Sequence, residues 1–154
     1  MNNIKFHAWI KEEEKMVKVA AIAFEKNSFD TKSYVLGTAP HLYDIDNNCY
    51  ALEDCILLQF SGLQDDEGEN IYDRDIVEIQ NTAETKTPYV SIVNLTPCGV
   101  LVDGYPSHVK AGIGGSRLLI DYIDYGEVNQ YYKKCKKLGN IFENPELLKE
   151  GKFV

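Results

Sequence analysis

Two cysteines lie close in the sequence to a histidine and to carboxylates, which are the residue types of a cysteine hydrolase. Cys49 and Cys55 follow His41 and Asp44, and Asp54 directly precedes Cys55. Nucleophilic catalysis needs a thiol of lowered pKa and a base within hydrogen-bond reach. Residues this close in the sequence, on adjacent strands, seldom build that arrangement, and Cys55 opens an apolar run in which a thiol is usually inert. The pattern therefore favours a protein that is not an enzyme.

A strongly acidic segment could supply carboxylates to a metal or catalytic site. Residues 62–79 contain seven acidic side chains and a single basic one, Arg74. Residues 65–69 lack the spacing of a calcium loop, and their composition predicts a type I turn closed by Gly68 in the left-handed region. The cysteines and histidines are scattered, without the close pairs of a zinc site, and the glycine-rich residues 111–117 lack the lysine of a phosphate loop. We expect no metal and no cofactor.

A cluster of tyrosines and lysines is the remaining group with a functional pattern. Tyrosine is enriched at protein interfaces, and tyrosines interleaved with lysines can stack bases and hold phosphates. The alternatives are ordinary strand packing for the tyrosines and a solvated strand face for the lysines. The net charge of −8 repels phosphate backbones. We therefore expect a protein-interaction module, with self-association as one form of it, and keep a nucleic-acid-binding small β-barrel as the alternative. The candidate interaction residues are Tyr122, Tyr125, Tyr131, Tyr132, Lys133, Lys134, Lys136 and Lys137.

The composition is that of a globular protein. The chain has 154 residues, of which 44% are hydrophobic and 26% charged, close to the average for soluble domains. No stretch approaches the roughly 18 apolar residues of a membrane span, and the first residues lack the pattern of a signal peptide. We expect one domain over residues 1–154, located in the cytoplasm and without membrane partners.

Short strands must position these groups. Residues 4–10 alternate between apolar and polar side chains, and residues 16–24 resume after a polar turn, which predicts a hairpin. Residues 55–60 suit a strand buried on both faces, and residues 118–123 another strand. The clear helix start is at residues 144–146, where asparagine can cap and proline fits the first position. Together they predict a mainly β, α+β fold: a rolled antiparallel sheet or a small barrel with a short C-terminal helix.

Three blocks of the sequence, in order, resemble the YopX family. They are KFHAW at residues 5–9, the central motif FSGL…GENIY…DIV within residues 60–77, and GNIFENPELL at residues 139–148. The resemblance implies a YopX-like fold and an origin in a phage or prophage, hence in a bacterial host cell. It implies no catalytic residues, because the family is functionally uncharacterised.

The chain departs from the family pattern at several positions. His7 and Ile10 stand where the family usually has arginine and aspartate, and residues 81–134 match least, as a variable region. Arg74 stands where the family favours glycine. A non-glycine residue there argues against a left-handed corner at that position.

Overall fold

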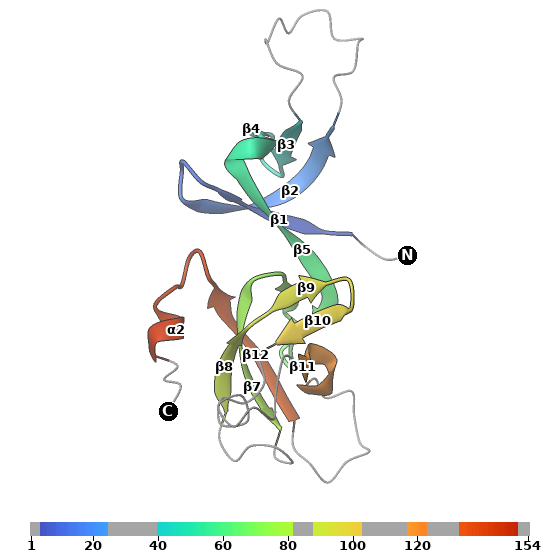
Figure 1. Cartoon of the computed structure of the whole chain (residues 1–154). Helices are drawn as coiled ribbons and strands as arrows, with labels where there is room; N and C mark the ends of the chain where they lie inside the picture. Colours follow the sequence, from blue (N-terminus) through green and yellow to red (C-terminus); the bar gives the residue numbers. More distant parts are fainter. Residues whose placement is uncertain (1–3, 25–39, 82–87, 103–116, 123–132, 151–154) are drawn as a thin grey trace, which may run out of the picture. The chain divides into compact units, whose positions relative to one another are not determined.

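The computed structural model describes residues 4–24, 40–81, 88–102, 117–122 and 133–150 (Figure 1). The chain divides into two compact units, an N-terminal unit (Lys5–Leu58) and a C-terminal unit (Gln59–Val154, with Met1–Ile4). The described strands pair in antiparallel fashion, which confirms the mainly β prediction. They form open sheets and no closed barrel within the described ranges, so the small-barrel alternative is wrong. The single domain over residues 1–154 and the variable region 81–134 stay predictions.

The N-terminal unit is built on the predicted hairpin. In it, β1 and β2 pair with Ala8 opposite Val17, and the alternate residues Ala8 and Ile10 are buried with Leu42. This is the outcome expected of strict alternation, because every second side chain points to the same face of a strand. The strand order is β4-β3-β2-β1-β5. The elements are β1 (Phe6–Ile10), β2 (Lys15–Ala23), β3 (His41–Asp44), β4 (Cys49–Ala51), the 3-10 turn η1 (Leu52–Asp54) and β5 (Cys55–Gln64), which continues into the C-terminal unit.

The apolar run at the start of β5 is not buried on both faces, contrary to the prediction. Within residues 55–60, Leu58 is buried, Gln59 is exposed and the others are half-buried. A continuous apolar run shows only that the side chains are hydrophobic. Whether both faces of the strand are covered depends on the tertiary packing.

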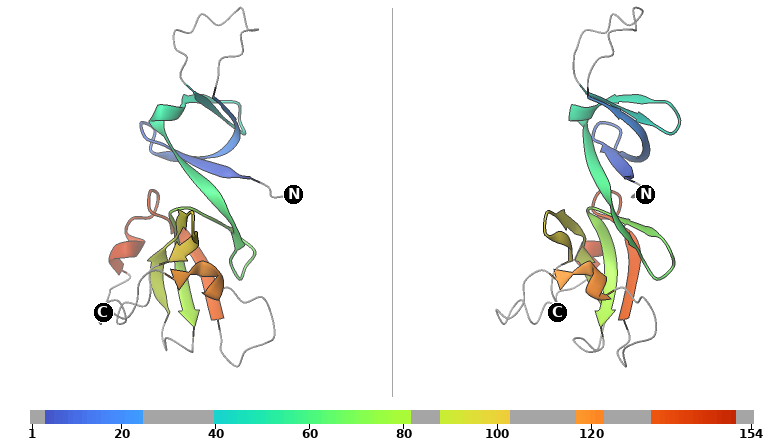
Figure 2. Two further views of the ribbon diagram at one scale, coloured as in Figure 1. Left: turned by 45° about the vertical axis from the view of Figure 1, so that its right-hand side comes forward. Right: turned by 90° about the vertical axis from the view of Figure 1, so that its right-hand side faces the viewer.

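The C-terminal unit contains a three-stranded sheet, a three-stranded ribbon and the β5–β6 hairpin (Figures 1 and 2). The sheet has the order β12-β7-β8 and the ribbon the order β11-β10-β9. One core unites them, with Ile71, Val77, Val102, Leu119 and Cys135 fully buried. The elements are β6 (Asn70–Tyr72), β7 (Asp75–Asn81), β8 (Tyr89–Ile92), β9 (Asn94–Thr96), β10 (Gly99–Val102), β11 (Arg117–Leu118), the 3-10 turn η2 (Leu119–Tyr122), β12 (Lys133–Asn140) and α2 (Leu147–Glu150).

Two predicted elements differ in the structure. A strand is expected over residues 118–123, but in the described part, residues 118–122, only Leu118 belongs to a strand (β11), and η2 follows with Leu119 buried. The predicted C-terminal helix is reduced to the single turn α2. The Asn144 Oδ1 accepts a hydrogen bond from the Asn140 N–H at 3.4 Å, and α2 begins three residues later at Leu147. The end of β12 therefore uses the asparagine that the sequence pattern assigned to a helix. None of the described helices is long and apolar enough to span a membrane.

Gly68 and Arg74, at two corners of the C-terminal unit, both have left-handed backbone. Gly68 has φ 84°, which confirms the predicted turn. Arg74 has φ 64°, so the left-handed corner forms although the residue is not glycine. Its N–H donates to Val93 O at 2.8 Å and its carbonyl accepts from the Ile141 N–H at 3.2 Å. These tertiary hydrogen bonds hold the strained conformation in place.

Candidate functional site

The acidic turn (residues 65–69) is held together by its own first carboxylate. Asp65 is buried, and its Oδ1 accepts hydrogen bonds from the N–H groups of Glu67 and Glu69, both at 2.9 Å. The Gly68 N–H donates to Asp65 O, and the Asp65 N–H to Glu69 O. A short side chain that bonds nearby backbone donors is the usual reason for aspartate in a turn. Asp65 thus works as a turn former, and the predicted turn chemistry is confirmed.

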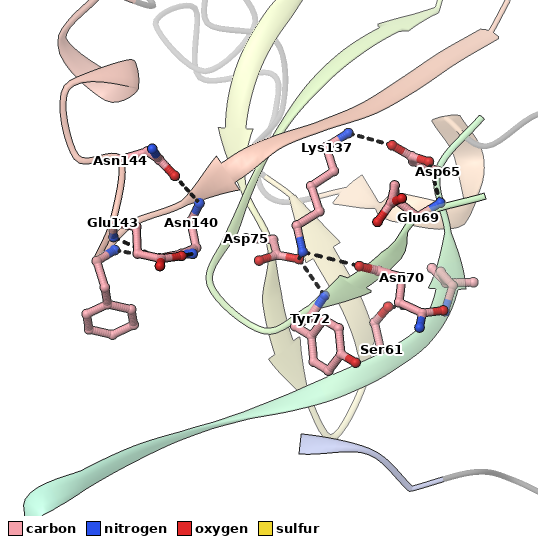
Figure 3. A network of polar contacts seen from close by, with 12 residues as sticks. Ser61, Asp65, Glu69, Asn70, Tyr72, Asp75, Lys137, Asn140, Glu143 and Asn144 are labelled. Atoms are coloured by element: carbon pink, nitrogen blue, oxygen red, sulfur yellow. Dashed lines mark hydrogen bonds and ion pairs between the residues drawn. The ribbon is translucent and has the colours of Figure 1, made fainter. Parts of the chain in front are cut away.

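The same turn docks on the outer edge of β12, which is the terminal strand of its sheet (Figure 3). Asp66 makes a pair of contacts with Cys135: its N–H donates to Cys135 O at 3.0 Å, and its Oδ2 accepts from the Cys135 N–H at 2.9 Å. Asp65 Oδ2 accepts from the Lys137 N–H at 2.9 Å. Two outward backbone donors of an edge strand are therefore bonded by aspartate carboxylates, which protects the edge from another strand.

Lys137 lies at the centre of a second polar contact (Figure 3). Its ammonium is 2.7 Å from Asp75 Oδ2, donates to Asn70 O at 3.3 Å and lies 5.3 Å from the centre of the Tyr72 ring. Asp75 also accepts from the Tyr72 N–H at 2.7 Å. Burial raises the pKa of Asp75 above its usual range, and it outweighs the opposing attraction of Lys137. The pair therefore organises the β6–β7 corner inside the fold.

The other described lysines of the candidate cluster also contact carboxylates. Lys134 Nζ lies 3.1 Å from Glu78 Oε1, and Lys136 Nζ lies 2.7 Å from Glu67 Oε1. The hydrogen bond to Glu67 raises the pKa of Lys136. Lys134, Lys136 and Lys137 of β12 thus lie against acidic groups of β7 and of the acidic turn, and a phosphate ligand would have to compete with those groups.

The remaining candidate residues are only partly described. Tyr122 is the last residue of η2 and Lys133 the first of β12, and their side chains lie outside the described part. Tyr125, Tyr131 and Tyr132 fall outside the described residues altogether. The structure therefore brings together Lys134, Lys136 and Lys137 on one strand, and the tyrosine half of the cluster stays a prediction.

Two residues of the hypothetical cysteine hydrolase, Asp44 and Cys55, have other partners. Asp44 accepts from the N–H groups of Asp46 and Asn48 and from the Asn48 side chain, all at 2.9 Å, and so holds the β3–β4 turn. Cys55 Sγ donates to Ala51 O at 3.3 Å, and burial raises its pKa. These contacts do not activate a thiol. Among the described residues, no three His, Cys, Asp or Glu side chains gather as they would around a metal ion.

Sequence reasoning missed the two contacts that organise the C-terminal unit. The Asp75–Lys137 ion pair and the Asp65–Lys137 backbone contact join residues more than sixty positions apart. No local period connects such residues. The available signal was complementary charge, since the acidic segment and the lysine cluster were both evident in the sequence.

Comparison with known proteins agrees with this architecture. Residues 5–149 match a protein family whose description is "YopX protein". The crystal structure of protein yopX from Bacillus subtilis is similar, with a TM-score of 0.55, 17% sequence identity and coverage of 96% of this chain and 98% of that one. Protein EF1440 from Enterococcus faecalis has a TM-score of 0.50 and 15% identity, over 94% of this chain and 97% of that one. At these identities the likeness concerns the fold. No curated protein gives a significant match. The resemblance found in the three sequence blocks is confirmed, and the chain belongs to the YopX family.

Proposed function

We propose that this YopX-family protein is a protein-interaction module whose contact surface lies on β11 and η2, the segment that leads into Tyr122. The observation that carries the proposal is the exposure of two large aliphatic side chains, Leu118 at 42% and Ile120 at 47%. Between them Leu119 is fully buried in the core. The backbone is therefore anchored, and the two exposed side chains are presented at fixed positions. Burying such side chains against a partner is favourable by roughly 1.5–3 kcal/mol each when complete.

A non-catalytic role is supported by the way in which the reactive groups are used. Asp44 and Asp65 bond turn backbone, and burial raises the pKa of the Cys55 and Cys135 thiols. Groups engaged in this way stabilise the fold and are not poised as bases or nucleophiles.

The nucleic-acid alternative receives less support. Its lysines on β12 contact Glu78, Glu67 and Asp75. Each contact would have to break before a phosphate could be held, and the net charge of −8 opposes the approach of a nucleic acid. For the interaction module we also propose a location in the cytoplasm of a bacterial host of a phage or prophage, as the YopX resemblance implies.

The test compares Ile120→Asp with Ile45→Asp, a matched control in the N-terminal unit that is also exposed, at 60%. Both variants exchange an exposed isoleucine for a charge. We expect self-association in light scattering over a concentration series, or capture of a partner from host cells, to be lost in Ile120→Asp and retained in Ile45→Asp. Equal behaviour of the two variants contradicts the proposed surface. Salt-dependent binding of a labelled single-stranded DNA, unaffected by Ile120→Asp, would favour the alternative instead.

A further inference from the structure

The outer edge of β12 has an unusual occupant. The outer backbone groups of an edge strand are normally unpaired and open to another strand, but here two N–H groups of β12, those of Cys135 and Lys137, donate to aspartate carboxylates. Cys135 O also accepts from the Asp66 N–H. Two consecutive aspartates of the acidic turn therefore take the place of a neighbouring strand.

The charge on β12 matches this occupant. The strand has the sequence KKCKKLGN, with four lysines and no acidic residue. Lys136 adds an ion pair with Glu67 of the same turn. The edge thus offers two backbone donors beside the Lys136 ammonium, which is the chemistry that selects carboxylates in an extended chain.

From this arrangement we propose that the β12 edge is a docking edge for an acidic extended protein segment, and that the acidic turn closes it as an internal competitor. Asp66 and Glu67, which contact Cys135 and Lys136, are exposed, so solvent weakens their attachment. Because the turn belongs to the same chain, its effective concentration at the edge is at least on the order of millimolar. An external segment therefore binds measurably only when the turn is released. The inference concerns a surface other than β11–η2 and does not depend on the proposed function.

The experiment releases the turn by the double variant Asp65→Asn, Asp66→Asn. The single oxygen of an asparagine at position 65 can accept from the turn or from the Lys137 N–H, but not from both as Asp65 does. The control is Glu67→Gln, Glu69→Gln, which also removes two charges but keeps both edge carboxylates. The probe is a peptide with the sequence of residues 64–70 and blocked ends. It is added up to concentrations on the order of several millimolar, because the attached turn competes for the edge at an effective concentration of that order. The readout is the nitrogen-15 amide signals of Cys135 and Lys137 in the full chain.

We expect saturable shifts of both amide signals in the release variant, with an apparent affinity at least tenfold higher than in the control. The same peptide with both aspartates replaced by asparagine should cause no saturable shift. Equal affinity in the two variants, or no shift in either, overturns the proposal. If the release variant does not fold, Asp66→Asn alone frees the Cys135 donor and keeps the turn-forming Asp65, and the same criterion applies to that signal. Rapid hydrogen exchange of both amides in the wild type would overturn it as well.

Discussion

Replacing Arg74 with glycine should stabilise the protein, although it removes a side chain. Arg74 has φ 64°, and its N–H and carbonyl are bonded to Val93 and Ile141. The backbone therefore cannot relax out of the left-handed region without breaking tertiary hydrogen bonds. Glycine adopts this region freely, because it has no Cβ to collide with its own backbone.

Three contributions set the size of the effect. A non-glycine residue in the left-handed region costs roughly 1–2 kcal/mol. Glycine relieves this strain but itself costs about 0.4–1 kcal/mol, because an unfolded chain with glycine has more conformational freedom to lose on folding. The Arg74 Nε to Asp73 Oδ2 contact, at 3.7 Å and with the arginine side chain 48% exposed, contributes little in water. The net expectation is a gain of about 0–1.6 kcal/mol with a midpoint of about 0.8 kcal/mol, and this midpoint corresponds to about 2–3 °C in Tm for a chain of this size.

The assay is urea unfolding followed by circular dichroism, with Arg74→Ala as the control. Alanine also removes the guanidinium group, but it keeps a Cβ and therefore the strain. We expect Arg74→Gly to raise the midpoint without changing the slope, and Arg74→Ala to leave it unchanged or slightly lower. Equal midpoints for the glycine and alanine variants would refute the reasoning, because the difference between them isolates the backbone conformation.

Three further expectations follow from single contacts. Gly139→Ala should lower the free energy of unfolding by about 1–3 kcal/mol, because an added Cβ would meet the Asn144 side chain; thermal unfolding measures the loss, and Asn144→Ala in the same chain should restore part of it. Asp44→Asn should lower the free energy of unfolding at neutral pH. Hydrogen bonds, first that of the Asn48 side chain, lower the pKa of Asp44, so the ionised form is the stabilising one, and the difference between variant and wild type should shrink as the pH falls through the folded pKa. A difference that stays constant down to the acid-unfolding range would contradict this. Burial raises the pKa of Cys135 to about 12, so a thiol reagent at pH 8 should label exposed Cys49 quickly and Cys135 only on unfolding; mass spectrometry of the labelled peptides decides.

Local patterns predicted the elements that depend on local physics. The β1–β2 hairpin followed from alternation, and the turn ending in Gly68 followed from the preference of glycine for positive φ. The predictions that failed depended on surroundings. Residues 119–122 form a 3-10 turn because Leu119 is drawn into the core, and Asn144 bonds the end of β12 where a helix cap was expected.

The amino-acid sequence by itself determined the class of fold, the family and the positions of the main turns, because alternation, turn residues and motif spacing act between near neighbours in the chain. Only the tertiary structure decided the partners of the charged groups. The acidic turn and the lysines of β12 are far apart in the sequence, and folding joins them at the edge of a sheet. Arg74 shows the same division: its intrinsic preference argues against a left-handed corner, and its backbone hydrogen bonds with Val93 and Ile141 impose one. Long-range contacts override local preference wherever their combined free energy exceeds the local strain.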